Sequence, residues 1–333
     1  MRTTFMHTLN SRVLPLGLVL GLAVTACLMP GCRAARIAAA RKALQQESGQ
    51  PSGIAEVTQL EYESPDAALA ALRSAVTTKD PVALVEVLGP NWRSLQSGDA
   101  AERERQRLAF LARLEGSSFE TVSGGAILLV GRPEDPDRFP FAVPLVKSSG
   151  GWQWDTDAGI LEAQVRRIGR NELDTIEALG TIAAAQVAFR DQDIDGDGRP
   201  NFASALIGSD TRSDALYRPA GPVETALIGP ALASADVTDG RAGAVPFHGY
   251  LYSMLPMQGP GATGGAKDFR DTYRRYMNGF ALLAYPAEYR VTGVTCFIVG
   301  PDGTVYEKDL GDDSEAAAAK VTAFDPTGWA KVE

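Results

Sequence analysis

The sequence has little histidine, with only His7 and His248 among its 333 residues. This excludes zinc centres built from several imidazoles, because those ligands must stand close together. Beyond residue 26, His248 is the single candidate base for a Ser-His-Asp triad. A lone histidine just before a strand is more often packed or hydrogen-bonded than catalytic, so we expect a structural role for it.

Cysteine is equally scarce, and the chain has only Cys27, Cys32 and Cys296. The first two lie near the N-terminus, and the third stands alone in the apolar run 294–299. The globular part therefore has no pair from which to form a disulfide. We expect Cys296 to pack as a small buried hydrophobic residue.

The N-terminus has an apolar run, but it is short for a membrane span, which needs about 20 residues. The run covers residues 13–26 and follows two arginines and no acid, which is typical of a signal peptide over residues 1–26. It ends in VTAC at Cys27, which resembles the lipobox of bacterial lipoproteins, where the cysteine is acylated and becomes the new N-terminus. Cys32 is a second candidate for lipidation, and an ordinary cleaved signal is the alternative.

The lipobox resemblance implies an exported protein held by lipid at the periplasmic face of the cell envelope. Residues 27–60 contain alanine and basic residues and then a Gln/Ser/Gly-rich stretch, which predicts a lipidated tether without a core. Leu28 follows Cys27, where enteric-type lipoproteins retained at the inner membrane carry aspartate. This favours an outer-membrane lipoprotein.

Basic residues are too few for a nucleic-acid-binding protein. There are 32 against 41 acidic residues, and removal of the two arginines in the signal peptide leaves 30 against 41. Basic patches supply most of the affinity for nucleic acids, so we expect no nucleic-acid partner. Residues 259–264 (GPGATG) match a dinucleotide fingerprint but lack its strand-turn-helix setting, so we expect no nucleotide either.

Residues 61–157 predict a first α+β domain. Ser64 and Asp80, each followed by proline, are helix N-cap signals, and a third helix is expected over residues 99–114. Strands are expected over residues 126–130, 139–146 and 152–154. Helices followed by antiparallel strands predict an α+β fold, and the order is similar to cone-shaped domains of the nuclear-transport-factor-2 (NTF2) type.

Residues 158–333 predict a second α+β domain. A helix is expected to break at Gly169, and a second helix is expected to begin at Asn171. Strands follow over residues 249–255, 280–284, 294–299 and 304–308, the last two joined by a Pro-Asp-Gly turn. A long helix before an antiparallel meander is similar to the globular heads of pilins and pseudopilins. The charged side chains of this helix depart from the apolar helix with which a pilin packs a filament.

Five short motifs carry a more specific family resemblance. They are 170–177 (RNELDTIE), 246–250 (PFHGY), 258–260 (QGP), 279–289 (GFALLAYPAEY) and 302–310 (DGTVYEKDL). With them the chain resembles the DUF2950 proteins, a bacterial exported family of undetermined function, over roughly residues 64–329. The resemblance implies an envelope location and brings no catalytic residues with it.

The stretch 191–201 (DQDIDGDGRPN) is where residue types and spacing together indicate specific chemistry. Calcium takes six to eight oxygen ligands, and an Asp-x-Asp-x-Asp-Gly run supplies several while glycine allows the sharp turn. The sequence therefore predicts a calcium site. Its predicted ligands are Asp191, Asp193, Asp195, Asp197 and Asn201.

The register of this loop can start at Asp191 or at Asp193. The second start places Asn201 at position nine, which resembles the loops of extracellular calcium modules. Position twelve is Phe202 if the loop starts at Asp191 and Ser204 if it starts at Asp193. Both starts therefore lack the glutamate that binds calcium with two oxygens at this position, and only weak calcium binding is expected. The alternative is an acidic turn whose side chains bind their own backbone and hold no ion.

These observations predict a non-enzymatic envelope lipoprotein that binds an unidentified envelope protein or polymer, with a structural calcium between helix and sheet. Two alternatives stay open. One is a hydrolase acting on envelope or extracellular polymer, with His248 and nearby acids in a cleft. The other is a pseudopilin-like component of a secretion or pilus assembly.

Overall fold

A computed structural model of the protein describes residues 58–96, 100–209, 212–219 and 225–332. The predicted signal peptide, both candidate lipidation cysteines and most of the predicted tether lie outside these residues. The chain divides into two compact units, Met1–Glu162 and Ala163–Glu333. Both contain helices and antiparallel sheet, which confirms the α+β class. No helix in the described residues has the length and apolar character to span a membrane.

The helices of the N-terminal unit begin where the sequence predicts. Ser64 Oγ accepts a hydrogen bond from the N–H of Ala67 at 3.2 Å, and the Asp80 carboxylate accepts one from the N–H of Val82 at 2.9 Å. The proline after each cap therefore occupies the first helical position. In chain order the helices are α3 (Pro65–Thr78), α4 (Pro81–Leu88), the 3-10 helix η1 (Pro90–Leu95) and α5 (Ala100–Leu114).

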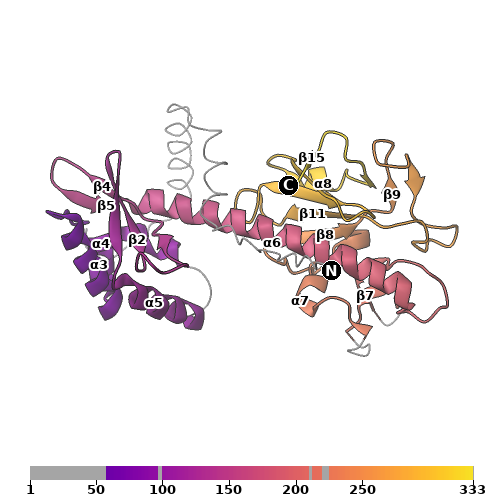
Figure 1. Ribbon diagram of the computed structural model, residues 1–333, viewed down its shortest axis with the longest axis horizontal. Coiled ribbons are helices and arrows are strands. Elements are labelled where there is room, and N and C mark those ends of the chain that lie inside the picture. The colour runs from indigo at the N-terminus through magenta and orange to yellow at the C-terminus, as the bar shows by residue number, and fades with distance from the viewer. Residues whose placement is uncertain (1–57, 97–99, 210–211, 220–224, 333) are drawn as a thin grey trace, which may run out of the picture. The chain divides into compact units, whose positions relative to one another are not determined.

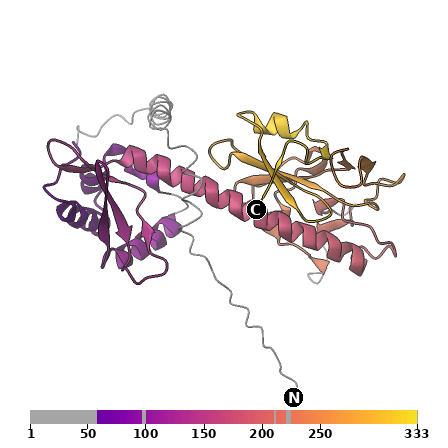
Figure 2. The same ribbon diagram turned by 45° about the horizontal axis from the view of Figure 1, so that its top comes forward.

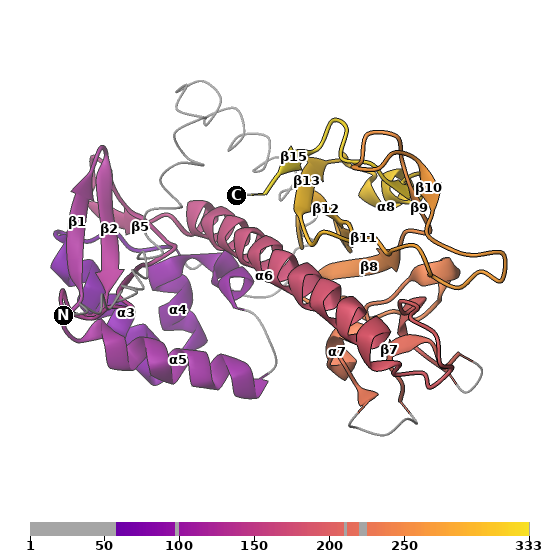
Figure 3. The same ribbon diagram turned by 45° about the vertical axis from the view of Figure 1, so that its right-hand side comes forward.

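The sheet of this unit has the order β1-β2-β4-β5, with β3 also paired to β2, and all pairs are antiparallel. Its strands are β1 (Ser118–Val122), β2 (Gly125–Val130), β3 (Phe139–Pro140), β4 (Leu145–Lys147) and β5 (Trp152–Trp154). Helices α3 and α5 pack on it (Figure 3). The core between them contains Trp154, whose ring lies edge-on to Phe141 at 5.8 Å and whose indole N–H donates to Ala68 O at 3.4 Å.

The continuous strand predicted over residues 139–146 is wrong. The chain pairs at β3, leaves the sheet and pairs again at β4. Pro140 and Pro144 have no N–H to donate to a neighbouring strand, so an unbroken ladder cannot form here. Strand β1 was not predicted because it is a largely exposed edge strand without a clear apolar alternation.

The break predicted at Gly169 is also wrong, because one helix, α6 (Thr156–Gln192), runs through it (Figure 1). A glycine inside a helix costs about 1 kcal/mol relative to alanine, which packing of the helix readily outweighs. Asn171 lies inside the helix instead of capping it, and its Nδ2 donates to Thr292 O at 2.8 Å. The division between the two units falls within α6.

The C-terminal unit is built on an antiparallel meander in the order β15-β13-β12-β11-β8. Its members are β8 (Tyr250–Met254), β11 (Leu282–Pro286), β12 (Thr295–Val299), β13 (Val305–Asp309) and β15 (Ala330–Lys331). The four strands predicted after residue 248 correspond to β8, β11, β12 and β13. The predicted Pro-Asp-Gly turn forms as well, with Gly303 at φ +73° and its N–H donating to Gly300 O at 3.0 Å.

Smaller elements complete this unit. A parallel pair joins β6 (Ala205–Ile207) to β7 (Ala215–Tyr217), and a second small sheet has the order β10-β9-β14. Those three strands are β9 (Met257–Gln258), β10 (Lys267–Asp268) and β14 (Ala323–Phe324). The short helices are α7 (Pro230–Ala233), the 3-10 helix η3 (Thr238–Gly240) and α8 (Ser314–Ala318).

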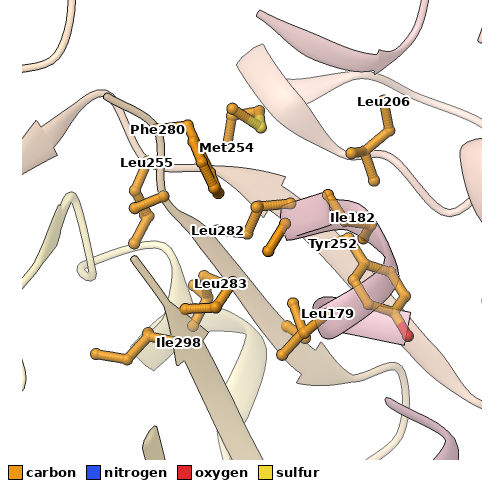
Figure 4. Packing of buried hydrophobic residues seen from close by; sticks show 14 of the residues in the cluster. Leu179, Ile182, Leu206, Tyr252, Met254, Leu255, Phe280, Leu282, Leu283 and Ile298 are labelled. Carbon is orange, nitrogen blue, oxygen red and sulfur yellow. The ribbon is translucent and has the colours of Figure 1, made fainter. Parts of the chain in front are cut away.

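The core of the C-terminal unit lies between α6 and the meander (Figures 2 and 3). Leu179 and Ile182 of α6 lie against Tyr252 of β8 and Leu282 of β11 (Figure 4). Cys296 is fully buried, as predicted, and burial raises the pKa of its thiol to about 12. The thiol therefore stays protonated and unreactive at neutral pH.

Candidate metal site

The acidic loop begins where α6 ends. Asp193 adopts the left-handed conformation at φ +48°, and the N–H of Ile194 reaches back to Phe189 O at 3.4 Å. This is the Schellman pattern of a helix C-terminus, with aspartate in the position that glycine usually takes. Gly196 and Gly198 also have positive φ, at +71° and +74°, which favours glycine. The backbone therefore turns tightly around the aspartate side chains.

Three of the predicted ligands come together in this turn. Ligand oxygens of Asp193, Asp195 and Asp197 lie within 4.8 Å of one another. The N–H of Gly198 donates to both carboxylate oxygens of Asp193, at 3.1 and 3.0 Å, and fixes that side chain toward the loop. A cation placed among these oxygens would be reached by all three carboxylates.

Asn201 and Asp195 provide the best evidence that the loop fits a cation. Asn201 is 3% exposed, and its Nδ2 donates to Asp195 Oδ2 at 3.2 Å. Within the described residues, Oδ1 of each side chain is buried and has no hydrogen-bond partner. Leaving a buried acceptor unpaired costs about 1–3 kcal/mol. Both orphaned atoms are oxygens, which are the ligands that calcium prefers.

The fifth predicted ligand, Asp191, is not part of this cluster. It lies on the last turn of α6, where its carboxylate accepts from Nε of Arg190 at 2.8 Å. The geometry therefore favours the register that starts at Asp193 over the one that starts at Asp191. In that register Ser204 stands at position twelve, and its hydroxyl donates to Asp214 O at 3.3 Å.

The charges of the loop are only partly balanced by the protein. Burial raises the pKa of Asp195, the hydrogen bonds from Asn201 and from the backbone of Asp197 oppose the rise, and the neighbouring carboxylates of Asp197 and Asp193 add to it. Asp197 has a basic neighbour, with Arg199 Nη1 at 3.6 Å from its Oδ2. The uncompensated negative charge is therefore greatest near Asp193 and Asp195, the side that a divalent ion would neutralise.

Two buried polar side chains hold the chain that leaves the loop, and the sequence analysis missed both. Gln186 of α6 pairs with the backbone of Ala203, accepting from its N–H at 2.9 Å and donating to its C=O at 3.1 Å. Asp236 accepts from the N–H groups of Leu206 and Ile207 at 2.8 and 3.1 Å. In the sequence, the only sign of this role is that each of the two is a polar residue within an apolar stretch. These bonds hold the chain that follows the acidic loop to α6 at Ala203 and to Asp236 at Leu206 and Ile207.

His248 lies at a second polar cluster on α6. Its Nδ1 is 3.1 Å from Asp174 Oδ2. His248 and Gly249 form a two-residue turn with φ of +49° and +75°, closed by reciprocal hydrogen bonds between Phe247 and Tyr250. Glu172 accepts from the N–H groups at the start of β12, at 3.0 Å each. Two of the motifs that carry the family resemblance, 170–177 and 246–250, therefore meet where α6 is fastened to the sheet.

The glycine-rich loop 259–264 is also explained by packing. A side chain on Gly259 or Gly261 would lie 2.3 Å from the carboxylate of Asp325. Gln258 is buried beneath the loop and donates to Thr263 O and Gly265 O at 2.9 and 2.7 Å. These contacts give the glycines a role in folding.

The comparisons with known proteins agree with the motif resemblance. The family whose description is "Protein of unknown function (DUF2950)" matches residues 59–332. No curated protein and no solved structure matches the chain. The NTF2-like and pilin-like resemblances therefore stay predictions.

Proposed function

The chain belongs to the DUF2950 family over residues 59–332, and from that premise we propose a calcium-binding envelope lipoprotein without enzymatic activity. In this proposal a lipid on Cys27 holds the chain at the periplasmic face of the outer membrane. Calcium at Asp193, Asp195, Asp197 and Asn201 braces the passage from α6 to the rest of the C-terminal unit. The protein then acts by binding another envelope protein or polymer.

The observation that carries the calcium proposal is the pair of orphaned buried oxygens on Asp195 and Asn201. An acidic turn that only bonds its own backbone explains the contacts of Asp193 and Asp197, but it does not explain these two atoms. A bound cation would accept both as ligands and offset the repulsion among the three carboxylates. Without a bidentate glutamate, the affinity fits the millimolar range of extracellular calcium modules.

The hydrolase alternative is supported by one contact, between His248 and Asp174, which would orient the imidazole of a catalytic triad. The same contact also fastens the turn at residues 247–250 to α6, and this structural role needs no nucleophile. The pseudopilin alternative rests on the order of helix and meander alone. We therefore favour the binding module.

Calcium is expected to stabilise the protein, and Asp195→Asn is expected to remove that effect. Free calcium at ten times its Kd adds about 1.4 kcal/mol to the free energy of unfolding, because only the folded loop binds it. For a unit of this size the Tm should rise by about 3–5 °C in scanning calorimetry. Without calcium, Asp195→Asn should be at least as stable as the parent, because it removes a buried charge from beside two others.

Two controls accompany this measurement: a variant outside the cluster, and the dependence of stability on pH. Asp191→Asn should keep the calcium response, since Asp191 lies outside the cluster. The raised pKa of Asp195 means that the folded loop holds its proton to higher pH than the unfolded chain does. Stability without calcium should fall as pH rises through that pKa, and the stabilisation by calcium should disappear as pH falls through it. A Tm that ignores millimolar calcium at neutral pH would contradict the proposal.

The lipid anchor has its own test. Cys27→Ser should move the protein from the membrane fraction to the soluble periplasmic fraction, because the acyl chains supply the anchoring energy. Cys32→Ser is the matched control and should stay with the membrane. Fractionation after labelling with a fatty acid gives both results. Release by Cys32→Ser alone would assign the anchor to Cys32, and membrane retention of the double variant would exclude lipidation at either cysteine.

A further inference from the structure

The N-terminal unit contains a cavity of about 380 Å³ that has no part in the calcium proposal. It lies where α4 passes into η1 and where β5 passes into α6. Its walls are residues 88–91 and 153–157, together with Gln59 and Val146. The cavity is therefore built from segments that are far apart in sequence.

Two carboxylates dominate the charge of this cavity. Asp155 Oδ1 accepts from the N–H of Ala158 at 3.0 Å, and Asp157 Oδ1 accepts from Nδ2 of Asn91 at 3.1 Å. Both lie at the N-terminus of α6, where the helix dipole places a partial positive charge. The dipole contributes roughly half a positive charge against two negative charges, and the described residues that line the cavity include no lysine, arginine or histidine. The site therefore repels anions and attracts cations.

Among the neutral polar groups of the cavity, Gln59 keeps one oxygen acceptor. Gln59 donates through Nε2 to Val87 O at 3.0 Å and to Trp154 O at 2.7 Å, which leaves its Oε1 as an acceptor beside Gly89. Gly89 has φ +79°, and a side chain there would lie 2.9 Å from that oxygen. The hydroxyl of Thr156, which is 5% exposed, has no hydrogen-bond partner within the described residues. A ligand rich in donors would pair with the two carboxylates and with the Gln59 amide oxygen.

Leu88, Pro90 and Val146 give the cavity an apolar wall as well. An ammonium group has three donors and no acceptor, so it suits two carboxylates and an amide oxygen, and an alkyl chain suits the apolar wall. We propose that this cavity binds a short aliphatic amine of the diamine or polyamine class. A neutral sugar could bond the amides but would leave both negative charges uncompensated.

Isothermal titration of the purified full-length protein in neutral detergent at low ionic strength tests this proposal. Cadaverine and spermidine should bind with Kd at or below about 1 mM, whereas glutarate and glucose should not bind. Asp157→Asn should weaken amine binding about tenfold or more, because it removes one charge while its amide oxygen can still accept from Asn91. Asp137→Asn, an exposed acid of the same unit paired with Arg113, should leave binding unchanged.

Each result decides the question. Selective loss in Asp157→Asn, with an unchanged Tm, supports the amine site. Absence of amine binding up to about 10 mM, equal weakening in both variants, or binding of glutarate or glucose with similar affinity overturns it. Calcium binding is measured separately in the C-terminal unit, so either proposal can fail without the other.

Discussion

Replacing Asp236 with alanine is expected to destabilise the C-terminal unit by about 3–5 kcal/mol. Asp236 is 1% exposed, and its Oδ2 accepts from the N–H groups of Leu206 and Ile207 while its Oδ1 accepts from the N–H of Thr238 at 2.8 Å. Each donor left unpaired in the interior costs about 1–3 kcal/mol. The alanine also leaves a small cavity. No other single polar side chain described above satisfies three backbone donors.

Urea denaturation of the parent and variants measures this effect. Asp236→Asn should lie between alanine and the parent, because the amide keeps one acceptor but turns an N–H toward a backbone donor. The matched control is Asp239→Asn, which removes the charge of an exposed partner of Arg212 at a position with φ +59° that asparagine tolerates, and it should change stability by less than about 1 kcal/mol. A loss below about 1 kcal/mol in Asp236→Ala would show that water replaces the carboxylate, contrary to our account.

Local signals in the sequence were enough to predict much of the secondary structure. The caps at Ser64 and Asp80 and the turn at Gly303 depend on residues within three positions of one another, so the sequence contains the whole interaction. The strands of the meander were predicted for a similar reason, because each is a short run rich in apolar β-branched and aromatic residues that is bounded by turn residues.

The wrong predictions arose where distant contacts override local preference. Gly169 has a weak helix propensity, yet α6 continues through it, because hydrogen bonds such as that from Asn171 to Thr292 join the helix to a loop 121 residues away. The split of residues 139–146 depends on which backbone positions face β2, and this is known only once the strands are paired.

At the candidate site, too, local sequence patterns predicted some features and distant contacts decided the others. Residue type and spacing identified Asp193, Asp195, Asp197 and Asn201, which the fold brings into one turn. They could not decide the register, because it depends on where α6 ends. The helix extends to Gln192 and holds Asp191 on its last turn, away from the cluster. Nor could they identify the side chains that fix the loop exit, since those residues bond to backbone atoms 17 and 30 positions away.

Gln186→Leu is expected to destabilise the C-terminal unit by about 2–4 kcal/mol and to reduce the calcium response. Leucine has a similar size but no polar atoms, so the buried N–H and C=O of Ala203 both lose their partners. Because Ala203 follows Asn201 by two residues, its release should also loosen Asn201, the proposed ninth-position ligand, and weaken the proposed calcium binding. Gln192→Leu, at the exposed end of the same helix, should change stability by less than about 0.5 kcal/mol.

The two effects of Gln186→Leu can be separated by measuring unfolding with and without calcium. If the side chain acts only in folding, stability falls equally under both conditions. If it also holds the loop in a binding geometry, the loss is larger in calcium, because part of the calcium stabilisation disappears with it. An equal loss with a full calcium response would show that the bonds between Gln186 and Ala203 act only in folding. The proposed ligand oxygens would then be held by the turn from Asp193 to Gly198 alone.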